Sequence, residues 1–245
     1  MIPMMARLAL RHRAWRYRRR VDPRGVEWVG ERLDPGDAAV DAGAYKGGYT
    51  YWMRRAVGDD GTVLAFEPQR EAASLLRSYV AAFGWSNVEV HEVALSSAPG
   101  EGALLRPGSE PSPAASLVGA SLPPSSRRTA VRLDALDRVL AKRPPSSRVG
   151  LIKCDVEGHE LDVLRGADST LREHRPAILV ECESRHLREH SIADVFEHLA
   201  RLGYRGSFFW GEREEDVARF DARIHQVEGR KPYANNFAFV WSGGP

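Results

Sequence analysis

Two acidic residues stand at the ends of consecutive predicted strands, and each is followed by residues that let the chain turn. Asp41 follows the apolar residues 38–40 and begins the sequence Asp41-Ala-Gly43-Ala44-Tyr-Lys-Gly47, while Glu67 follows residues 62–66. A glycine directly after a strand lets the backbone approach a ligand without a side-chain clash. A carboxylate at the end of the next strand can accept both hydroxyls of a ribose. Together the two positions predict a site for a nucleoside cofactor.

The chemistry of the first loop narrows the choice of cofactor. A dinucleotide-binding loop has three glycines in the pattern G-x-G-x-x-G, and the loop after residue 40 lacks this pattern. The carboxylate of Asp41 would repel the pyrophosphate that such a loop receives. It suits the positively charged amino-acid end of S-adenosylmethionine (SAM) instead. We therefore expect the loop residues Asp41, Gly43, Ala44 and Gly47, together with Glu67, to bind SAM.

A third polar cluster follows the predicted strand at residues 149–153. It contains Asp155, Glu157 and His159 within five positions, and Gly158 permits a tight turn before the next helix. Asp155 precedes that helix, so we expect its side chain to point into the cleft at the end of the strand. It could orient an acceptor molecule or the methionine end of SAM. Glu157 and His159 are the two candidates for a general base.

A divalent cation is an open alternative at the same edge of the sheet. Glu181 follows the predicted strand at residues 177–180, next to the strand that ends before Asp155. Two carboxylates on neighbouring strands could hold Mg²⁺, which would lower the pKa of an acceptor hydroxyl. No third ligand is identifiable, so Glu181 counts as a catalytic candidate, and Asp155 and Glu181 as metal ligands only if the reaction needs Mg²⁺.

The elements that must position these residues alternate between short apolar runs and helical patterns. Such alternation predicts a parallel sheet with helices on both faces. Strands are expected at 38–40, 62–66, 87–95, 149–153 and 177–180, and helices at 47–57, 160–164 and 192–202. Residues 207–210 and 237–241 would complete the sheet, as an antiparallel hairpin. The segment from about 96 to 130 begins with a long stretch rich in Pro, Gly and Ser, which predicts a binding loop or lid.

The N-terminal segment differs from the rest of the 245-residue chain. Eight arginines lie within the first 24 residues, although the formal net charge of the whole chain is only +2. We expect a basic helical extension over residues 1–34, with Leu8, Leu10 and Trp15 packed on the catalytic domain of residues 35–245. Contact with phosphates or with an anionic membrane surface is the alternative for this segment. The sequence leaves the oligomeric state open.

Two further features bear on the location of the protein. No apolar run approaches the roughly 20 residues that span a bilayer. The two cysteines are too few for a disulfide framework or a tetrahedral zinc site, so we expect a reducing, cytoplasmic setting.

Short motifs follow one another in a fixed order along the chain. They are Asp41-Ala-Gly43-Ala-Tyr-Lys-Gly47-Gly-Tyr49-Thr50, Phe66-Glu67-Pro68, Ala94-Leu95-Ser96, Leu133-Asp134, Ile152-Lys153-x-Asp155-Val156-Glu157-Gly158-x-Glu160, Val163-Leu164-x-Gly166-Ala167 and Asn235-Asn236-Phe237. In this order they resemble the motifs of the FkbM family of methyltransferases, over about residues 37–240.

The resemblance implies a class I methyltransferase (Rossmann-like) fold, with a mostly parallel seven-stranded sheet and an antiparallel C-terminal strand. It implies SAM as the methyl donor and adds four residues to the expected cofactor site, namely Tyr49, Pro68, Val93 and Ala94. Family members usually methylate a hydroxyl oxygen on sugars, glycolipids, polyketides or other secondary metabolites. A small-molecule or glycan acceptor is therefore expected. The alternatives are a non-catalytic module of the same fold or an RNA methyltransferase, but no nucleic acid is expected because the basic charge is confined to one end.

Overall fold

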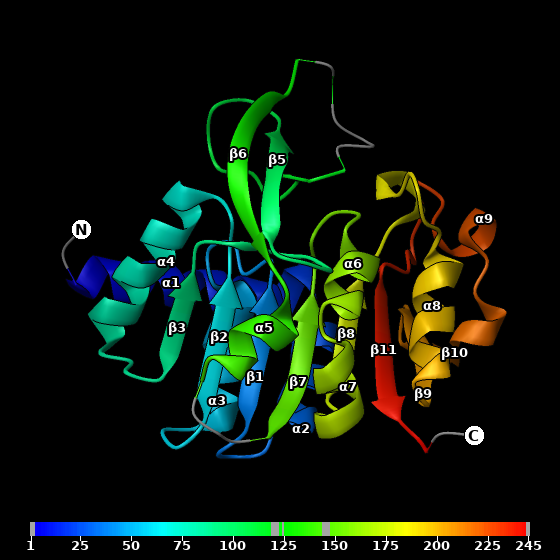
Figure 1. The fold of residues 1–245 in the computed structure, drawn as a ribbon, viewed down its shortest axis with the longest axis horizontal. Helices are drawn as coiled ribbons and strands as arrows, with labels where there is room; N and C mark the ends of the chain where they lie inside the picture. Colours follow the sequence, from blue (N-terminus) through cyan, green and yellow to red (C-terminus); the bar gives the residue numbers. More distant parts are fainter. Residues whose placement is uncertain (1–2, 119–122, 124, 144–147, 244–245) are drawn as a thin grey trace.

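The computed structural model describes residues 3–118, 123, 125–143 and 148–243. Its main sheet has eight strands in the order β10-β9-β11-β8-β7-β1-β2-β3 (Figure 1). In that order they are Arg213–Asp216, Tyr204–Trp210, Asn236–Trp241, Ala177–Glu181, Val149–Cys154, Ala38–Ala42, Thr62–Phe66 and Val88–His91. Strands β8, β7, β1, β2 and β3 pair in parallel, whereas β11 pairs antiparallel with both β8 and β9. The expected mostly parallel sheet with an antiparallel C-terminal strand is confirmed, with β10 as an additional short edge strand.

Helices cover both faces of the sheet, as expected. The helices α1 (Pro3–Arg16), α2 (Pro23–Arg32), α3 (Gly48–Val57) and α4 (Arg70–Phe83) pack on one face. On the other face lie α5 (Leu136–Ala141), α6 (Glu160–Arg165), α7 (Asp168–His174) and α8 (Ile192–Arg201). A short helix, α9 (Ala222–His225), and 3₁₀ turns at Ser184–His186 and Val217–Arg219 lie in the C-terminal third.

Alternating side chains of the central strands supply the two cores. In β7, Ile152 belongs to the core under α5–α8, while Leu151 belongs to the core under α1–α4. In β2, Leu64 belongs to the core under α5–α8 and Val63 to the core under α1–α4. Successive side chains of a strand point to opposite faces, so a strand covered on both sides reads as a continuous apolar run. This is why the short apolar runs of the sequence predicted the central strands well.

The third predicted strand, at residues 87–95, is divided between two sheets. Residues up to His91 form β3, whereas Ala94 and Leu95 form β4 and pair in parallel with Leu133 and Asp134. The partner strand is β6 (Arg127–Asp134), which also pairs antiparallel with β5 (Gly100–Arg106). The segment expected to be a loop therefore contains two long strands. Their apolar pattern is weak because only Ala94, Leu104 and Val131 are buried in the core of this small sheet.

The small sheet stands above the carboxyl ends of the central parallel strands (Figure 1). This is the edge at which open parallel sheets bind ligands. The segment predicted to form a binding loop or lid thus lies over the expected site.

The N-terminal helix packs with a different face from the one expected. Ala6, Leu10 and Ala14 are buried, at a spacing of four residues, and α1 lies against α3 and α4. Leu10 packs as predicted, and the ring of Trp15 lies edge-on to Trp52 of α3 with the ring centroids 5.3 Å apart, but Leu8 is 57% exposed, so the prediction for Leu8 is wrong. Small alanines let α1 approach closely, and Met4, Met5 and Leu8 on its outer side remain in solvent. Among the described residues, no helix is long and apolar enough to cross a membrane.

Candidate functional site

The loop after β1 is held close to the loop after β7. The backbone amide of Asp155 donates to the carbonyl of Ala42 (3.0 Å). Gly43 has φ = +81°, and a Cβ at this position would overlap the carbonyl oxygen of Asp155. Glycine is therefore required here both for the left-handed backbone and for the close approach of the two loops.

Glu67 ties the first loop to the end of β2. Its Oε2 accepts a hydrogen bond from the backbone amide of Tyr45 (2.8 Å), and its Oε1 accepts one from the backbone amide of Gln69 (2.7 Å). The side chain is buried, and burial raises its pKa to about 7, although the hydrogen bonds from Gln69 and Tyr45 partly oppose the rise. Each carboxylate oxygen can accept more than one hydrogen bond, so Glu67 keeps capacity for ligand hydroxyls.

Asp41 lies deeper, at the end of β1. Its Oδ2 accepts a hydrogen bond from the hydroxyl of Thr50 on α3 (2.6 Å). Burial raises the pKa of Asp41, while the ammonium group of Lys153 and the hydrogen bond from Thr50 oppose the rise. Gly47, the last glycine of this loop, takes a left-handed conformation and caps α3.

These residues line a cavity, which is called the cofactor cavity below. Eight of the nine predicted cofactor residues lie in its wall, namely Asp41, Gly43, Ala44, Tyr49, Glu67, Pro68, Val93 and Ala94. The ninth, Gly47, lies at the start of α3 instead. Three of the four catalytic candidates also line it, namely Asp155, Glu157 and His159.

The segment between β5 and β6 closes one side of the cofactor cavity. Pro113, Ala115 and Leu117 lie in the cavity wall. The hydroxyl of Tyr45 donates to the carbonyl of Pro111 (3.0 Å), and the side-chain amide of Gln69 exchanges two hydrogen bonds with the backbone of Ser112 (2.8 and 2.9 Å). The loops after β1 and β2 are thereby tied to the segment that covers them.

Lys153 places a buried positive charge among the carboxylates. Its Nζ lies 2.8 Å from Oδ2 of Asp155 and 4.9 Å from the centre of the Tyr49 ring. Burial alone would lower the pKa of Lys153, but Asp155, Glu181 and Asp41 outweigh it and raise the pKa. The ammonium group thus already interacts with both carboxylates considered as Mg²⁺ ligands. Within the described residues, no group of three or more His, Cys, Asp or Glu side chains could hold a metal ion, so the Mg²⁺ alternative gains no support.

The two candidates for the general base differ in their surroundings. His159 uses both ring nitrogens, since Nε2 lies 2.9 Å from Oγ of Ser96 and Nδ1 lies 3.4 Å from Oδ2 of Asp162. Glu157 has φ = +56°, which turns its side chain back over the end of β7, and its Oε2 lies 2.7 Å from Nδ1 of His186.

This pair has linked protonation states. Burial raises the pKa of Glu157, and the hydrogen bond to Glu157 raises the pKa of His186. A carboxylate whose pKa is raised accepts a proton more readily. Because Ser96 and Asp162 engage both ring nitrogens of His159, the geometry favours Glu157 over His159 as a proton acceptor.

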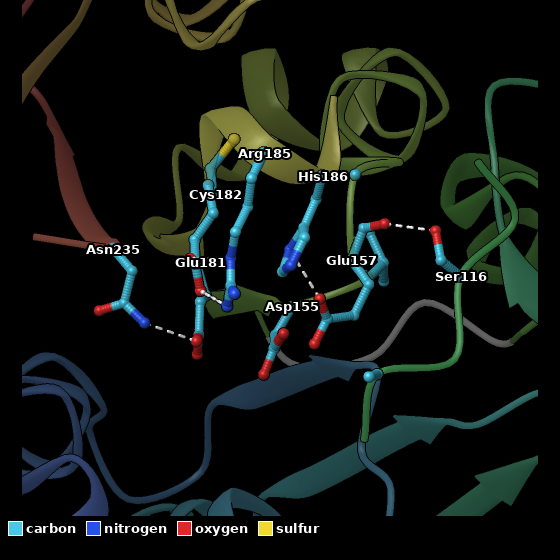
Figure 2. A network of polar contacts seen from close by, with 12 residues as sticks. Ser116, Asp155, Glu157, Glu181, Cys182, Arg185, His186 and Asn235 are labelled. Atoms are coloured by element: carbon cyan, nitrogen blue, oxygen red, sulfur yellow. Dashed lines mark hydrogen bonds and ion pairs between the residues drawn. The ribbon is translucent and has the colours of Figure 1, made fainter. Parts of the chain in front are cut away.

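Glu181 faces a second cavity, of about 950 Å³, rather than the first. We call it the acidic cavity because Asp22, Asp155, Glu157 and Glu181 lie in its wall. Figure 2 shows the carboxylates of Glu181, Asp155 and Glu157 in a row, with Asn235 beyond Glu181 and His186 beside Glu157. Asp155 and Glu157 line both cavities, as do Tyr17, Tyr49 and Pro113.

Several residues of the site were not among those predicted from the sequence. Tyr17 and Asp22 come from the N-terminal segment, and the hydroxyl of Tyr49 donates to Oδ2 of Asp22. No local pattern distinguishes them, because their position depends on how α1 packs against α3 and α4. Asn236 also lines the acidic cavity. The paired asparagines of Asn235-Asn236-Phe237 were a usable signal, since the motif was noted but not assigned a role.

Comparison with known proteins identifies the family. Residues 41–205 match the family of the methyltransferase FkbM domain, which covers more than half of the chain. A protein of Beauveria bassiana (strain ARSEF 2860) named Methyltransferase 1 is 30% identical over 162 residues, covering 60% of this chain and 65% of that protein. The chain thus spans slightly less than two thirds of this relative's length.

Solved structures agree with this result at the level of the fold. A methyltransferase FkbM from Methylobacillus flagellatus KT superposes with a TM-score of 0.55 at 15% identity, covering 88% of this chain and 50% of that one. A putative rRNA methylase from Clostridium thermocellum superposes with a TM-score of 0.51 at 12% identity, covering 91% of this chain and 96% of that one. The strand order, the match over residues 41–205 and these structures lead to one conclusion: the chain has the class I methyltransferase fold and belongs to the FkbM methyltransferase domain family.

Proposed function

We propose that this methyltransferase uses SAM to methylate a hydroxyl oxygen of a small-molecule or glycan acceptor. The proposal rests on one observation: two adjoining cavities share the carboxylates of Asp155 and Glu157 in their walls. One cavity is suited to the methyl donor and the other to the acceptor, so the methyl group would cross between them beside these two side chains.

The residues of the cofactor cavity fit SAM. Glu67 presents two carboxylate oxygens to the ribose hydroxyls, and Asp41 and Asp155 present negative charge to the amino group of the methionine end. Val93, Ala94 and Leu104 provide apolar surface for the adenine ring. When bound, SAM supplies a methyl group on a positively charged sulfur that leaves as a neutral thioether.

The protein has two tasks in this reaction. It must hold the acceptor oxygen, the methyl carbon and the sulfur in line, which contributes much of the rate enhancement in such displacements. It must also take the proton that the hydroxyl loses. We assign the positioning of the hydroxyl to Asp155, whose carboxylate is fixed by Lys153. We assign proton uptake to Glu157, which lines both cavities and contacts His186 through Oε2.

Calorimetric titration with SAM tests the cofactor assignment. We expect one SAM per chain in the wild-type protein, and a loss of about 100-fold in affinity for Glu67→Ala, because two hydrogen bonds to a charged group are removed. Glu101→Ala is the matched control, since Glu101 is exposed on β5 and does not line the cofactor cavity. Absence of binding at millimolar SAM would refute the proposed function.

The assignment of the base is tested separately, once an acceptor has been found. Glu157→Gln should lower kcat strongly while leaving SAM affinity nearly unchanged, and His159→Gln should lower it less. The reverse order would transfer the role to His159.

A further inference from the structure

The N-terminal helix α1 is apolar on two opposite sides. Its inner side packs on α3 and α4. Its outer side carries Met4, Met5, Leu8 and Trp15, which are all exposed. Met4, Leu8 and Trp15 follow one another after four and seven residues, a spacing that returns to the same face of a helix. These four side chains therefore form an exposed stripe, which we call the N-terminal patch.

Exposed apolar side chains are concentrated in this part of the protein. Eight large hydrophobic residues are exposed in the described part of the chain, and five of them lie between residues 4 and 21. Single exposed apolar residues are ordinary on protein surfaces, whereas a contiguous group of them marks a binding surface. The N-terminal patch thus requires a partner that can cover it.

The charge around the N-terminal patch is positive. Residues 1–21 contain seven arginines and neither aspartate nor glutamate. Among the described residues, none of these arginines lies within 4 Å of a carboxylate. Six of the seven are exposed, namely Arg7, Arg11, Arg16, Arg18, Arg19 and Arg20. Their charge is therefore available to a partner.

Three of these arginines lie around the tryptophan of the patch. The guanidinium carbons of Arg18 and Arg19 lie 5.9 and 4.8 Å from the ring centre of Trp15. Arg11 precedes Trp15 by one helical turn and lines the same surface groove as Trp15 and Arg18. Trp15 stays 43% exposed between them. Apolar surface and positive charge are thus combined within one small area.

The acidic side chains beside Trp15 do not cancel this charge. Glu27 and Glu31 of α2 line the same groove, but so do three arginines, one of which is Arg55 of α3. Glu27 is also paired with an arginine of its own helix, at 3.7 Å. The groove keeps an excess of positive charge.

Apolar side chains surrounded by arginines match the surface of an anionic lipid bilayer. The apolar side chains can enter between the acyl chains, while the longer arginines reach the lipid phosphates. A nucleic acid would pair with the arginines but leave the methionines and the leucine in water. A second copy of the chain, packed patch to patch, would bring two groups of seven arginines together. A membrane surface satisfies both features at once.

We propose that α1 anchors the protein to an anionic membrane surface. The N-terminal patch inserts below the headgroups, and Arg11, Arg18 and Arg19 lie at the level of the phosphates. The helix lies parallel to the membrane, because a stripe along its length must reach one depth. The inner side of α1 keeps its contacts with α3 and α4. This anchoring goes beyond the methyl-transfer reaction and does not depend on it.

Sedimentation with sucrose-loaded vesicles tests the anchor. The vesicles contain phosphatidylcholine alone or with about one third phosphatidylglycerol. Each arginine near an anionic surface strengthens binding about fivefold, so three of them should give the anionic vesicles an advantage of about 100-fold. The advantage should shrink as the salt concentration rises above about 0.1 M. Equal affinity for both kinds of vesicle, or no binding to the anionic ones, would overturn the proposal.

Two triple variants test the position of the charge. Arg11→Gln/Arg18→Gln/Arg19→Gln should lose about 100-fold in affinity for anionic vesicles. The control removes three exposed arginines from β6 and should keep its affinity; it is Arg127→Gln/Arg128→Gln/Arg132→Gln. Both variants have the same net charge, so a general electrostatic attraction would weaken equally in the two. An equal loss would therefore overturn the proposal.

Matched single variants test the apolar contact. Leu8 and Ile224 are 57% and 58% exposed, so Leu8→Gln and Ile224→Gln remove similar apolar surface from two different places. Only Leu8→Gln should weaken vesicle binding, by about fivefold or more. Tryptophan emission should shift to shorter wavelength on anionic vesicles, and Trp15→Phe should lose most of this shift whereas Trp241→Phe keeps it. Unchanged affinity of Leu8→Gln, or an unchanged shift in Trp15→Phe, would overturn the insertion.

The same variants identify the other occupants. A dimer seen by light scattering without lipid, and dissociated by Leu8→Gln, would assign the patch to a second copy and overturn the proposal if anionic vesicles are not bound. Binding of a labelled RNA without binding of vesicles would overturn it in favour of nucleic acid. All substituted side chains point away from the packed side of α1, and an unchanged temperature of thermal unfolding shows that each variant is folded.

Discussion

Lowering the pH should weaken SAM binding through Glu67. The buried carboxyl has a pKa of about 7 in the free protein, so it carries a proton below neutral pH. Ribose hydroxyls donate hydrogen bonds and therefore favour the ionised carboxylate. Binding should lower the pKa of Glu67 and release a proton, which means that affinity falls as the pH falls through about 7.

The magnitude follows from the shift in pKa. If the ribose hydroxyls restore the ordinary value of 4.5 in the complex, the dissociation constant at pH 5.5 is about 30-fold larger than at pH 8. This corresponds to about 2 kcal/mol of binding free energy. At pH 6, the binding of each SAM molecule should release about one proton from Glu67.

Calorimetry in two buffers of different ionisation enthalpy measures both the affinity and the released protons. Glu67→Gln is the matched control, because its amide is of similar size but cannot ionise. It should bind more weakly at pH 8 and lack the step near pH 7. The histidines of the site and the amino group of SAM titrate in both proteins, so the difference isolates Glu67. Superimposable pH profiles for the two proteins would refute the reasoning.

Three further substitutions test the packing beneath the site. Gly43→Ala should weaken SAM binding more than tenfold, because its Cβ would overlap Asp155. Gly36→Ala is the control, since Gly36 has φ = +92° but no atom lies near the position of its Cβ. This control should lower the free energy of unfolding by only about 1–2 kcal/mol through backbone strain. Equal effects of the two on thermal unfolding and SAM titration would contradict this. Lys153→Met should lower the free energy of unfolding in urea by about 3–5 kcal/mol at pH 8. The loss should be smaller at pH 5.5, where nearby carboxylates take up protons, and a pH-independent loss would contradict the ion-pair argument. Glu160→Gln should stabilise the protein by about 3 kcal/mol at pH 8 and by less than about 1 kcal/mol at pH 5. The buried carboxyl of Glu160 has a pKa of about 7. The stability gained by holding its proton is therefore fully present below about pH 4.5 and is lost as the pH rises through about 7. If Glu160→Gln left the free energy of unfolding unchanged at pH 8, this reasoning would be wrong.

The sequence predicted the residues at the carboxyl ends of the central strands well. Asp41, Glu67 and Asp155 stand at or just beyond the carboxyl ends of buried strands, and parallel neighbours bring such positions to one edge of a sheet. The local order of strand and loop was therefore sufficient to place them in one cavity.

Two parts of the site depended on contacts that no local pattern encodes. The small sheet was expected to be a loop, because the segment that starts at residue 96 is rich in Pro, Gly and Ser. The antiparallel pairing of β6 with β5 determines the structure of this segment more than burial does. Tyr17 follows α1, which packs on α3 and α4 through Ala6, Leu10 and Ala14. Asp22 is the N-cap of α2, which packs on α3, β7 and β8. Tertiary packing alone brings these residues to the site.

The position of α1 has a consequence for the order in which the site assembles. Residues 3–22 are synthesised before any strand of the sheet, yet α1 can dock only when α3 and α4 have formed. The indole N–H of Trp52 donates to the carbonyl of Ala14 (2.9 Å), which closes a loop of almost 40 residues. Contacts between distant segments form late because the entropy of loop closure opposes them. Residues 3–22 are thus made before the sheet but dock after it, and a ligand that touches Tyr17 or Asp22 stabilises their docking by mass action.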